Sequence, residues 1–175
     1  MTGLPRLAAA IGALLLLAAA ADMPTIQRVG DALAAGSRAT NARARAAAAE
    51  TLALLGAAPA DGQEDLTVAW RKGRRAAPPA AYRDRILGPV YHGLTLDPGA
   101  AVRFEQSFYA GQTARIAVVA VDRAPATLQI YDDEGKARCG AARSTCEWVP
   151  SWTARVRVEV QNRGVRRGKF FVVIR

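Results

Sequence analysis

The C-terminal half of the chain is a series of short apolar segments separated by turn residues, and this pattern limits the fold more than any other feature. From Arg155 to Gln161, valine alternates with arginine, glutamate and glutamine, which is typical of a strand with one buried face. The run 116–121 is apolar throughout and is predicted to be a strand covered on both faces. Short strands at near-regular spacing predict an all-β sandwich or barrel over residues 87–175.

The first 21 residues have the layout of a secretory signal peptide. Arg6 precedes an uncharged apolar run from Leu7 to Ala21 that ends in small residues. Small residues suit signal peptidase, so we predict cleavage after Ala20 or Ala21 and an exported protein, either periplasmic or secreted. A retained membrane anchor is disfavoured because the run is shorter than the ~20 residues that span a bilayer. The mature chain is therefore expected to lack a transmembrane segment.

The chain has two cysteines, Cys139 and Cys146. In an oxidising compartment such a pair is a disulfide candidate before it is a redox or metal site. The bond would close a small ring and contribute roughly 2.5 kcal/mol on the loop-entropy model. Metal binding would need more ligands, and the only histidine, His92, is far away in sequence.

Residues 22–58 are predicted to form an alanine-rich helical hairpin. Ile26, Val29 and Leu33 fall on one helical face, and Gly36 is expected to end the first helix. Alanine buries little area, so the hairpin either packs on another part of the protein or stays partly mobile. The predicted apolar stripe of the second helix consists of Ala44, Ala48, Leu52 and Leu55.

Residues 59–86 are predicted to be a basic, proline-containing linker with one candidate strand, Leu66 to Trp70. A basic cluster within it can bind a polyanion, although solvated loop charge is the commoner explanation. The formal net charge of +9 is compatible with both explanations, polyanion binding and solvated charge. The cluster consists of Arg71, Lys72, Arg74 and Arg75.

Two blocks in the C-terminal half have a specific spacing: Cys-x-Trp-x-Pro at 146–150, and Val-x-Val-x-Asn-x-Gly at 158–164. Together with the turns that precede them, they resemble the bacterial pre-peptidase C-terminal domain, a secreted β-sandwich of jelly-roll type. The resemblance covers residues 88–175. It implies a mainly β protein, a small antiparallel β-sandwich preceded by the helical segment, and an accessory role beside exported proteins.

Some members of that family bind calcium or matrix polymers. They often carry an aspartate-rich run before the strand that corresponds to residues 128–131, where this chain has Arg123 to Thr127. The weak calcium candidates that remain are Asp132, Asp133 and Glu134, although a plain turn explains them better. We therefore expect no cofactor.

The sequence contains no Gly-x-Ser-x-Gly elbow, no His-Glu-x-x-His and no Walker loop. His92 has no partner nucleophile nearby in sequence and is predicted to be a half-buried structural residue. We therefore predict that the protein is not an enzyme.

The leading functional hypothesis is a binding or accessory module that contacts a protein or polysaccharide partner through exposed aromatic side chains. The candidate contacts are Tyr109, Tyr131 and Trp152. The alternative is a basic envelope-associated protein that binds anionic polymers or lipid head groups through its arginine clusters. No specific nucleic acid is expected as a partner.

Overall fold

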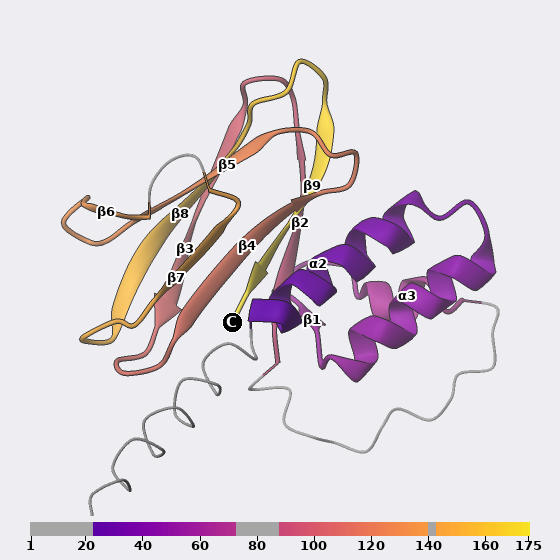
Figure 1. Cartoon of the computed structure of the whole chain (residues 1–175), viewed down its shortest axis with the longest axis horizontal. Coiled ribbons are helices and arrows are strands. Elements are labelled where there is room, and N and C mark those ends of the chain that lie inside the picture. The colour runs from indigo at the N-terminus through magenta and orange to yellow at the C-terminus, as the bar shows by residue number, and fades with distance from the viewer. Residues whose placement is uncertain (1–22, 73–87, 140–142) are drawn as a thin grey trace, which may run out of the picture.

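The computed structural model describes residues 23–72, 88–139 and 143–175, in which helices pack against a two-sheet β-sandwich (Figure 1). The predicted signal peptide and the linker residues 73–87 lie outside the described residues. The helices are α2 (Met23–Arg38), α3 (Ala42–Leu54) and the single turn α4 (Leu66–Ala69). The strands are β1 (Ala58–Pro59), β2 (Val90–Leu96), β3 (Ala101–Phe108), β4 (Ala114–Ala120), β5 (Ala126–Tyr131), β6 (Ala137–Cys139), β7 (Thr145–Trp148), β8 (Ala154–Asn162) and β9 (Gly168–Ile174).

The strands divide into two sheets with the connectivity of a jelly roll. One sheet has the order β1-β2-β9-β4-β7 and the other has the order β3-β8-β5-β6. All pairs are antiparallel except β1 with β2, where Ala58 lies opposite Val90. Most successive strands alternate between the sheets, which is the double Greek-key arrangement. The predicted antiparallel β-sandwich with a short helical segment before it is confirmed.

The alternating side chains of each strand build the core between the sheets. In β8, Val156, Val158 and Val160 are buried, whereas Arg155 and Arg157 are exposed. The valines belong to one apolar cluster that also contains alternate residues of β9. Burying each such side chain stabilises the fold by about 1.5–3 kcal/mol, so the alternation alone specifies which face of β8 points inward.

Helix α2 covers the outer face of the five-stranded sheet, and α3 packs against α2 (Figure 1). Ile26, Val29 and Leu33 of α2 form a second apolar cluster with Phe171 and Val173 of β9. These three residues of α2 are the face that the sequence predicts, so the helical segment is packed on the sandwich. Strands β4 and β9 of this sheet contribute to both apolar clusters or pack on α2, which explains the apolar runs 116–121 and 170–174. None of the helices in the described ranges is long and apolar enough to cross a bilayer.

The predicted end of the first helix at Gly36 is wrong. Helix α2 continues to Arg38, and the ring of Trp70 lies so close to Gly36 that an added Cβ would lie 2.2 Å from its Cζ3. The glycine therefore serves as a packing site instead of a stop. The predicted stripe of α3 is partly right, since Ala44 is exposed. The buried residues of α3 are Ala46, Ala48, Ala49 and Leu52.

The predicted strand at residues 66–70 is also wrong, because this segment forms the helical turn α4. The side chain of Asp65 caps the turn by accepting a hydrogen bond from the Thr67 amide at 2.9 Å. The Leu66 amide donates to the buried hydroxyl of Tyr91 at 2.9 Å. These contacts, made partly by a distant strand, outweigh the β-propensity of a short apolar run.

The predicted disulfide between Cys139 and Cys146 is present, with Cα atoms 5.9 Å apart. Cys139 ends β6 in the four-stranded sheet, and Cys146 lies in β7 of the five-stranded sheet. The bond therefore joins the two sheets at one edge of the sandwich.

Candidate binding surface at one end of the sandwich

Two loops lie side by side at the end of the sandwich where β3 turns into β4 and β7 turns into β8 (Figure 1, lower left). The Gly111 amide donates a hydrogen bond to the Pro150 carbonyl at 2.9 Å, and the Ala110 amide donates to the Thr153 hydroxyl at 3.2 Å. Gly111 has a φ of +72°, a left-handed conformation that glycine adopts without strain. The loops are thus held together by one backbone hydrogen bond and one bond to a threonine hydroxyl.

Three large apolar side chains on these loops face solvent. The exposed fractions are 65% for Tyr109, 57% for Val149 and 54% for Trp152. Only three other large apolar side chains of the described residues, Leu54, Val68 and Val165, are exposed in this way. Tyr109, Val149 and Trp152 are instead concentrated on two adjacent loops. They define a candidate binding surface, which we call the loop-end surface.

A small pocket opens beside Trp152, between the two sheets. Its apolar wall includes Phe108 and Trp148, whose rings meet edge to face with centroids 4.9 Å apart. Its volume of about 20 Å³ holds one or two water molecules or the tip of a side chain.

The rim of the pocket carries an ion pair between Asp132 and Arg138, at 3.0 Å. Asp132 is buried, and its carboxylate also accepts a hydrogen bond from the Lys136 amide at 2.7 Å. Asp133 and Glu134 are exposed beyond it, in the turn between β5 and β6. No group of three or more metal-binding side chains occurs in the described ranges. The carboxylate of Asp132 is committed to closing the turn and pairing with arginine.

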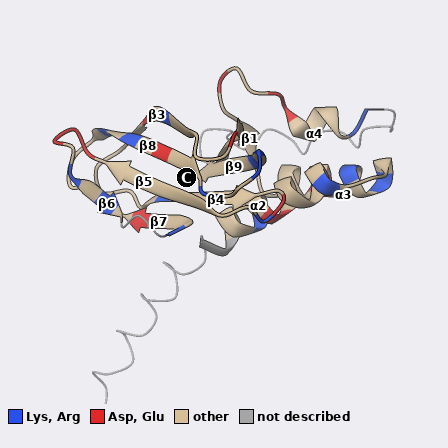
Figure 2. Cartoon of the chain, turned by 90° about the horizontal axis from the view of Figure 1, so that it is seen from above, with Lys and Arg blue, Asp and Glu red and all other residues tan. Residues whose placement is uncertain are grey.

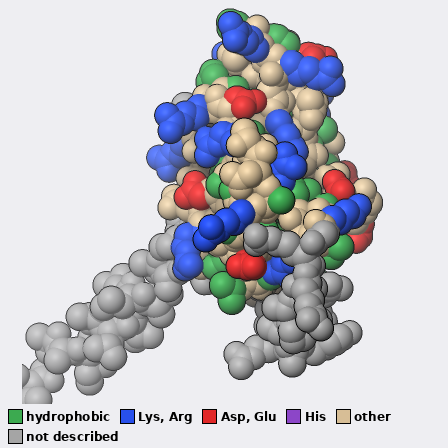
Figure 3. Space-filling model, turned by 90° about the vertical axis from the view of Figure 1, so that its right-hand side faces the viewer, with side chains coloured by type: hydrophobic (Ala, Val, Ile, Leu, Met, Phe, Trp, Pro, Cys, Tyr) green, Lys and Arg blue, Asp and Glu red, His purple; other side chains and the backbone are tan. Residues whose placement is uncertain are grey.

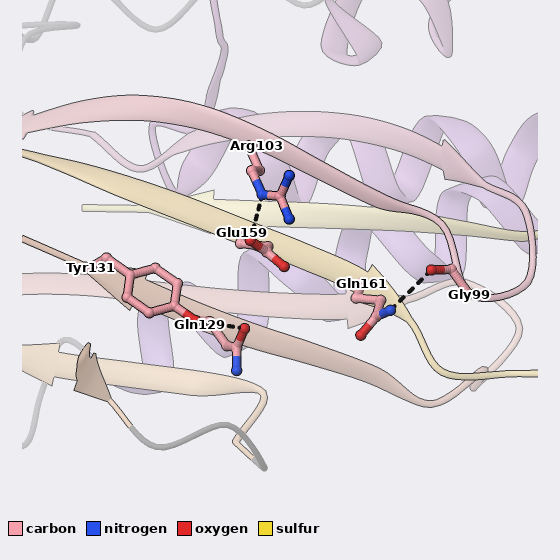
Figure 4. A network of polar contacts seen from close by, with 6 residues as sticks. All are labelled: Gly99, Arg103, Gln129, Tyr131, Glu159 and Gln161. Carbon is pink, nitrogen blue, oxygen red and sulfur yellow. Dashed lines mark hydrogen bonds and ion pairs between the residues drawn. The ribbon is translucent and has the colours of Figure 1, made fainter. Parts of the chain in front are cut away.

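Tyr131 does not join the loop-end surface. It lies on the outer face of the four-stranded sheet, where its hydroxyl donates to Gln129 at 2.9 Å and the Arg157 guanidinium lies 5.2 Å from its ring centroid. The same face carries an Arg103–Glu159 ion pair at 2.6 Å (Figure 4). Both signs of charge occur along β8 (Figure 2). This face is a network of side chains bonded to one another, and Tyr131 is half-buried within it.

The predicted basic cluster is only partly described. Arg71 is half-buried, and its guanidinium donates to the Ala49 carbonyl at 3.3 Å, so it helps to attach α4 to α3. Lys72 is exposed, and Arg74 and Arg75 lie outside the described residues. On the side of the molecule that carries the helices, basic side chains are spread out and interspersed with acidic ones (Figure 3).

His92 lies in β2 and stacks on Phe104 of β3, with ring centroids 4.6 Å apart. It is half-buried, as the sequence predicts, and burial lowers the pKa of its imidazole below the usual 6.5. The ring thus packs at the edge between the sheets.

Sequence reasoning missed Val149 and the pocket. The segment Trp148-Val149-Pro150-Ser151-Trp152 places three large apolar residues around a proline. Such a segment cannot continue a strand with its N–H groups paired, so the surplus apolar residues had to be exposed or to line a pocket. This signal could have identified the loop.

Comparisons with known proteins identify no family. No family model matches the chain, and no curated protein matches it. Among solved structures, the periplasmic lysozyme inhibitor PliG of Aeromonas hydrophila, an inhibitor of g-type lysozyme, matches with 11% identity and a TM-score of 0.39, covering 50% of this chain and 86% of its own. PirA matches with 18% identity and a TM-score of 0.32, covering 49% of this chain and 93% of its own. A de novo designed double-stranded β-helix matches with 12% identity and a TM-score of 0.31, covering 49% of this chain and 97% of its own. All three TM-scores are below 0.5, so no functional inference is drawn from these likenesses.

Proposed function

We propose that the protein is a non-catalytic exported binding module that engages a protein or polysaccharide partner through the loop-end surface. The observation that carries this proposal is the exposure of Tyr109, Val149 and Trp152 on two hydrogen-bonded loops beside a small apolar pocket. Tryptophan and tyrosine provide large contact areas at low entropic cost, and they dominate the binding energy of many interfaces.

The rigidity of the two loops supports the same proposal. Loops that are already ordered lose little conformational freedom when a partner binds, so more of the contact energy appears as affinity. The bonds from Gly111 to Pro150 and from Ala110 to Thr153 provide this order. Arg138 at the pocket rim adds a charged group beside the apolar centre.

Export and family membership remain part of the proposal. The Cys139–Cys146 bond fits an oxidising compartment such as the periplasm or the exterior, since disulfides are rare in the cytosol. The jelly-roll order of the strands fits an accessory domain of the pre-peptidase C-terminal type over residues 88–175.

The proposal is tested by capture from the envelope fraction of the exporting cell and by sedimentation with insoluble envelope polysaccharide. We expect Tyr109→Ala combined with Trp152→Ala to reduce capture at least ~10-fold, as interface aromatics do. Leu54→Ala combined with Val68→Ala is the matched control, because these side chains are exposed elsewhere. Equal capture by the two double variants and the unaltered protein would refute the assignment.

The alternative, attachment to anionic envelope material, is favoured by one observation. The hairpin between β8 and β9 exposes Arg163, Arg166 and Arg167 around Val165, which is 92% exposed. Arg167 alone of these has an acidic neighbour, Asp97, at 3.6 Å in the described ranges. Sedimentation with anionic lipid vesicles should weaken steeply between low and moderate salt. Binding that is insensitive to salt, or to an Arg166→Glu and Arg167→Glu double substitution, would count against it.

A further inference from the structure

Strand β3 is a long sheet edge that no other described strand covers. It runs for eight residues, Ala101–Phe108, and pairs with β8 alone. The other strands that end a sheet are short, with two residues in β1, three in β6 and four in β7. Proteins guard long edges with proline, lysine or bulges because free edges recruit other chains. β3 has no proline or lysine, and its register with β8 is unbroken.

The backbone of β3 shows which groups are available for pairing. The Asn162 amide donates to the Ala100 carbonyl at 3.0 Å, so the even-numbered residues of β3 direct their N–H and C=O groups toward β8. The odd-numbered residues therefore direct theirs away from the sheet. They are Ala101, Arg103, Glu105 and Ser107.

The outward residues of one copy are complementary in charge to the same residues of a second copy. If two β3 strands pair antiparallel about a two-fold axis at Phe104, Arg103 lies opposite Glu105 of the second copy, and Glu105 lies opposite Arg103. Opposite charges in directly opposed positions stabilise a strand pair. Both side chains are 64% exposed and lie on the open face of the sheet. The four outward residues of each copy would exchange about eight backbone hydrogen bonds.

The neighbouring registers do not have this property. An axis at Arg103 places two arginines opposite each other, and an axis at Glu105 places two glutamates opposite each other. An axis between two residues sets outward groups against inward ones, so the backbone bonds cannot form. Among these registers, the one with its axis at Phe104 is therefore the one that places opposite charges together and pairs the outward backbone groups.

We propose that the protein forms a two-fold symmetric homodimer in which β3 pairs antiparallel with β3 of a second copy, with the axis at Phe104. The pairing extends ion pairs that exist within one chain: Arg103 with Glu159 at 2.6 Å (Figure 4) and Glu105 with Arg155 at 3.1 Å. Across the interface the charges would alternate in sign along each row. The dimer goes beyond the proposed function, and it would place two loop-end surfaces at opposite ends of one joined sheet.

The test is sedimentation velocity of the chain from Asp22 onward, at increasing concentration. We expect a reversible dimer with a dissociation constant on the order of 10 µM, because one strand pair buries a small interface. Arg103→Glu and Glu105→Arg should each weaken self-association at least ~10-fold, since like charges then oppose each other. An equimolar mixture of these two variants should associate again, because each arginine of one then meets a glutamate of the other.

A third variant separates the backbone from the charges. Ser107→Pro removes an outward N–H without breaking a bond to β8, so it should abolish the dimer and leave the unfolding temperature of the monomer almost unchanged. Arg163→Glu, an exposed reversal away from β3, is the control that should still dimerise. A monomer at all concentrations, a mixture that fails to associate, or a dimeric Ser107→Pro variant would each overturn the proposal.

Discussion

At the scale of single residues, Asn162 organises one end of the sandwich although it appears in the sequence as an ordinary turn residue. Its side chain is fully buried. The side-chain amide donates to the carbonyls of Leu96 and Arg166 at 3.0 and 2.8 Å, and its oxygen accepts from the Gly164 amide at 2.8 Å. One side chain therefore joins the β2–β3 connection to the β8–β9 hairpin.

Replacing Asn162 by alanine should lower the free energy of unfolding by about 2–4 kcal/mol, because buried backbone groups lose their partners. Urea denaturation followed by tryptophan fluorescence measures the change. Gln161→Ala, next to it on the accessible face, is the control and should cost less than about 1 kcal/mol. Equal effects of the two substitutions would contradict the assigned role.

Tyr91 gives the protein a specific alkaline sensitivity. Burial raises the pKa of its hydroxyl from 10.0 to about 12. The folded state therefore favours the neutral form, and the resulting stability is fully present below pH 10 and is lost as the pH rises through 12. The loss should reach about 2–3 kcal/mol, measured as the free energy of unfolding against pH. Tyr91→Phe should remove this part of the pH dependence, and an unchanged alkaline profile would refute the assignment.

At the scale of elements, the contact of α2 with β4 depends on Gly30. A Cβ added there would lie 2.3 Å from Cγ2 of Val119, so the helix approaches the sheet at a position without a side chain. Alanine normally favours a helix by about 1 kcal/mol over glycine, but overlap in a packed contact costs about 1–3 kcal/mol.

We therefore expect Gly30→Ala to lower the unfolding temperature, although it improves helix propensity. Thermal unfolding followed by circular dichroism measures this effect. Ala35→Leu adds more volume at an exposed position of the same helix and should change stability by less than about 0.5 kcal/mol. A stabilised Gly30→Ala variant would show that α2 does not approach the sheet this closely.

The sequence predicted the elements better than their contacts. The buried faces of β8 and α2 can be predicted from periodicity alone. Apolar residues recur at every second position from Val156 in β8, and at helical spacing from Ile26 in α2. The prediction that Gly36 ends the helix is wrong because this glycine makes room for the ring of Trp70, which is distant in sequence. Tyr109 and Trp152 are exposed, and their proximity depends on hydrogen bonds between two loops, which no local pattern encodes.

At the scale of the whole molecule, the disulfide and the two apolar clusters hold three layers together: the helices, the five-stranded sheet and the four-stranded sheet. Since Cys139 and Cys146 lie in different sheets, their bond restricts separation of the sheets as well as the short loop between them. The loop-entropy contribution is roughly 2.5 kcal/mol.

Replacing both cysteines by serine should lower the unfolding temperature by about 5–10 °C, given the usual relation between free energy and unfolding temperature for a domain of this size. Differential scanning calorimetry measures the shift. Addition of a reductant should produce a similar shift in the unaltered protein and none in the double variant. An unchanged unfolding temperature would show that the bond contributes nothing to stability.

The position of β9 also dictates when this protein can fold. It follows every other described strand in the chain, yet it lies between β2 and β4 at the centre of its sheet and provides Phe171 and Val173 to the helices. A chain emerging from a ribosome or a translocation channel would hold α2, β2 and β4 without their shared partner until residue 174 is released. The five-stranded sheet and the packing of the helices on it can therefore be completed only after β9 emerges. Folding that depends on long-range strand pairing of this kind is slow. During that interval the apolar faces of the early elements are the surfaces that a chaperone would need to shield.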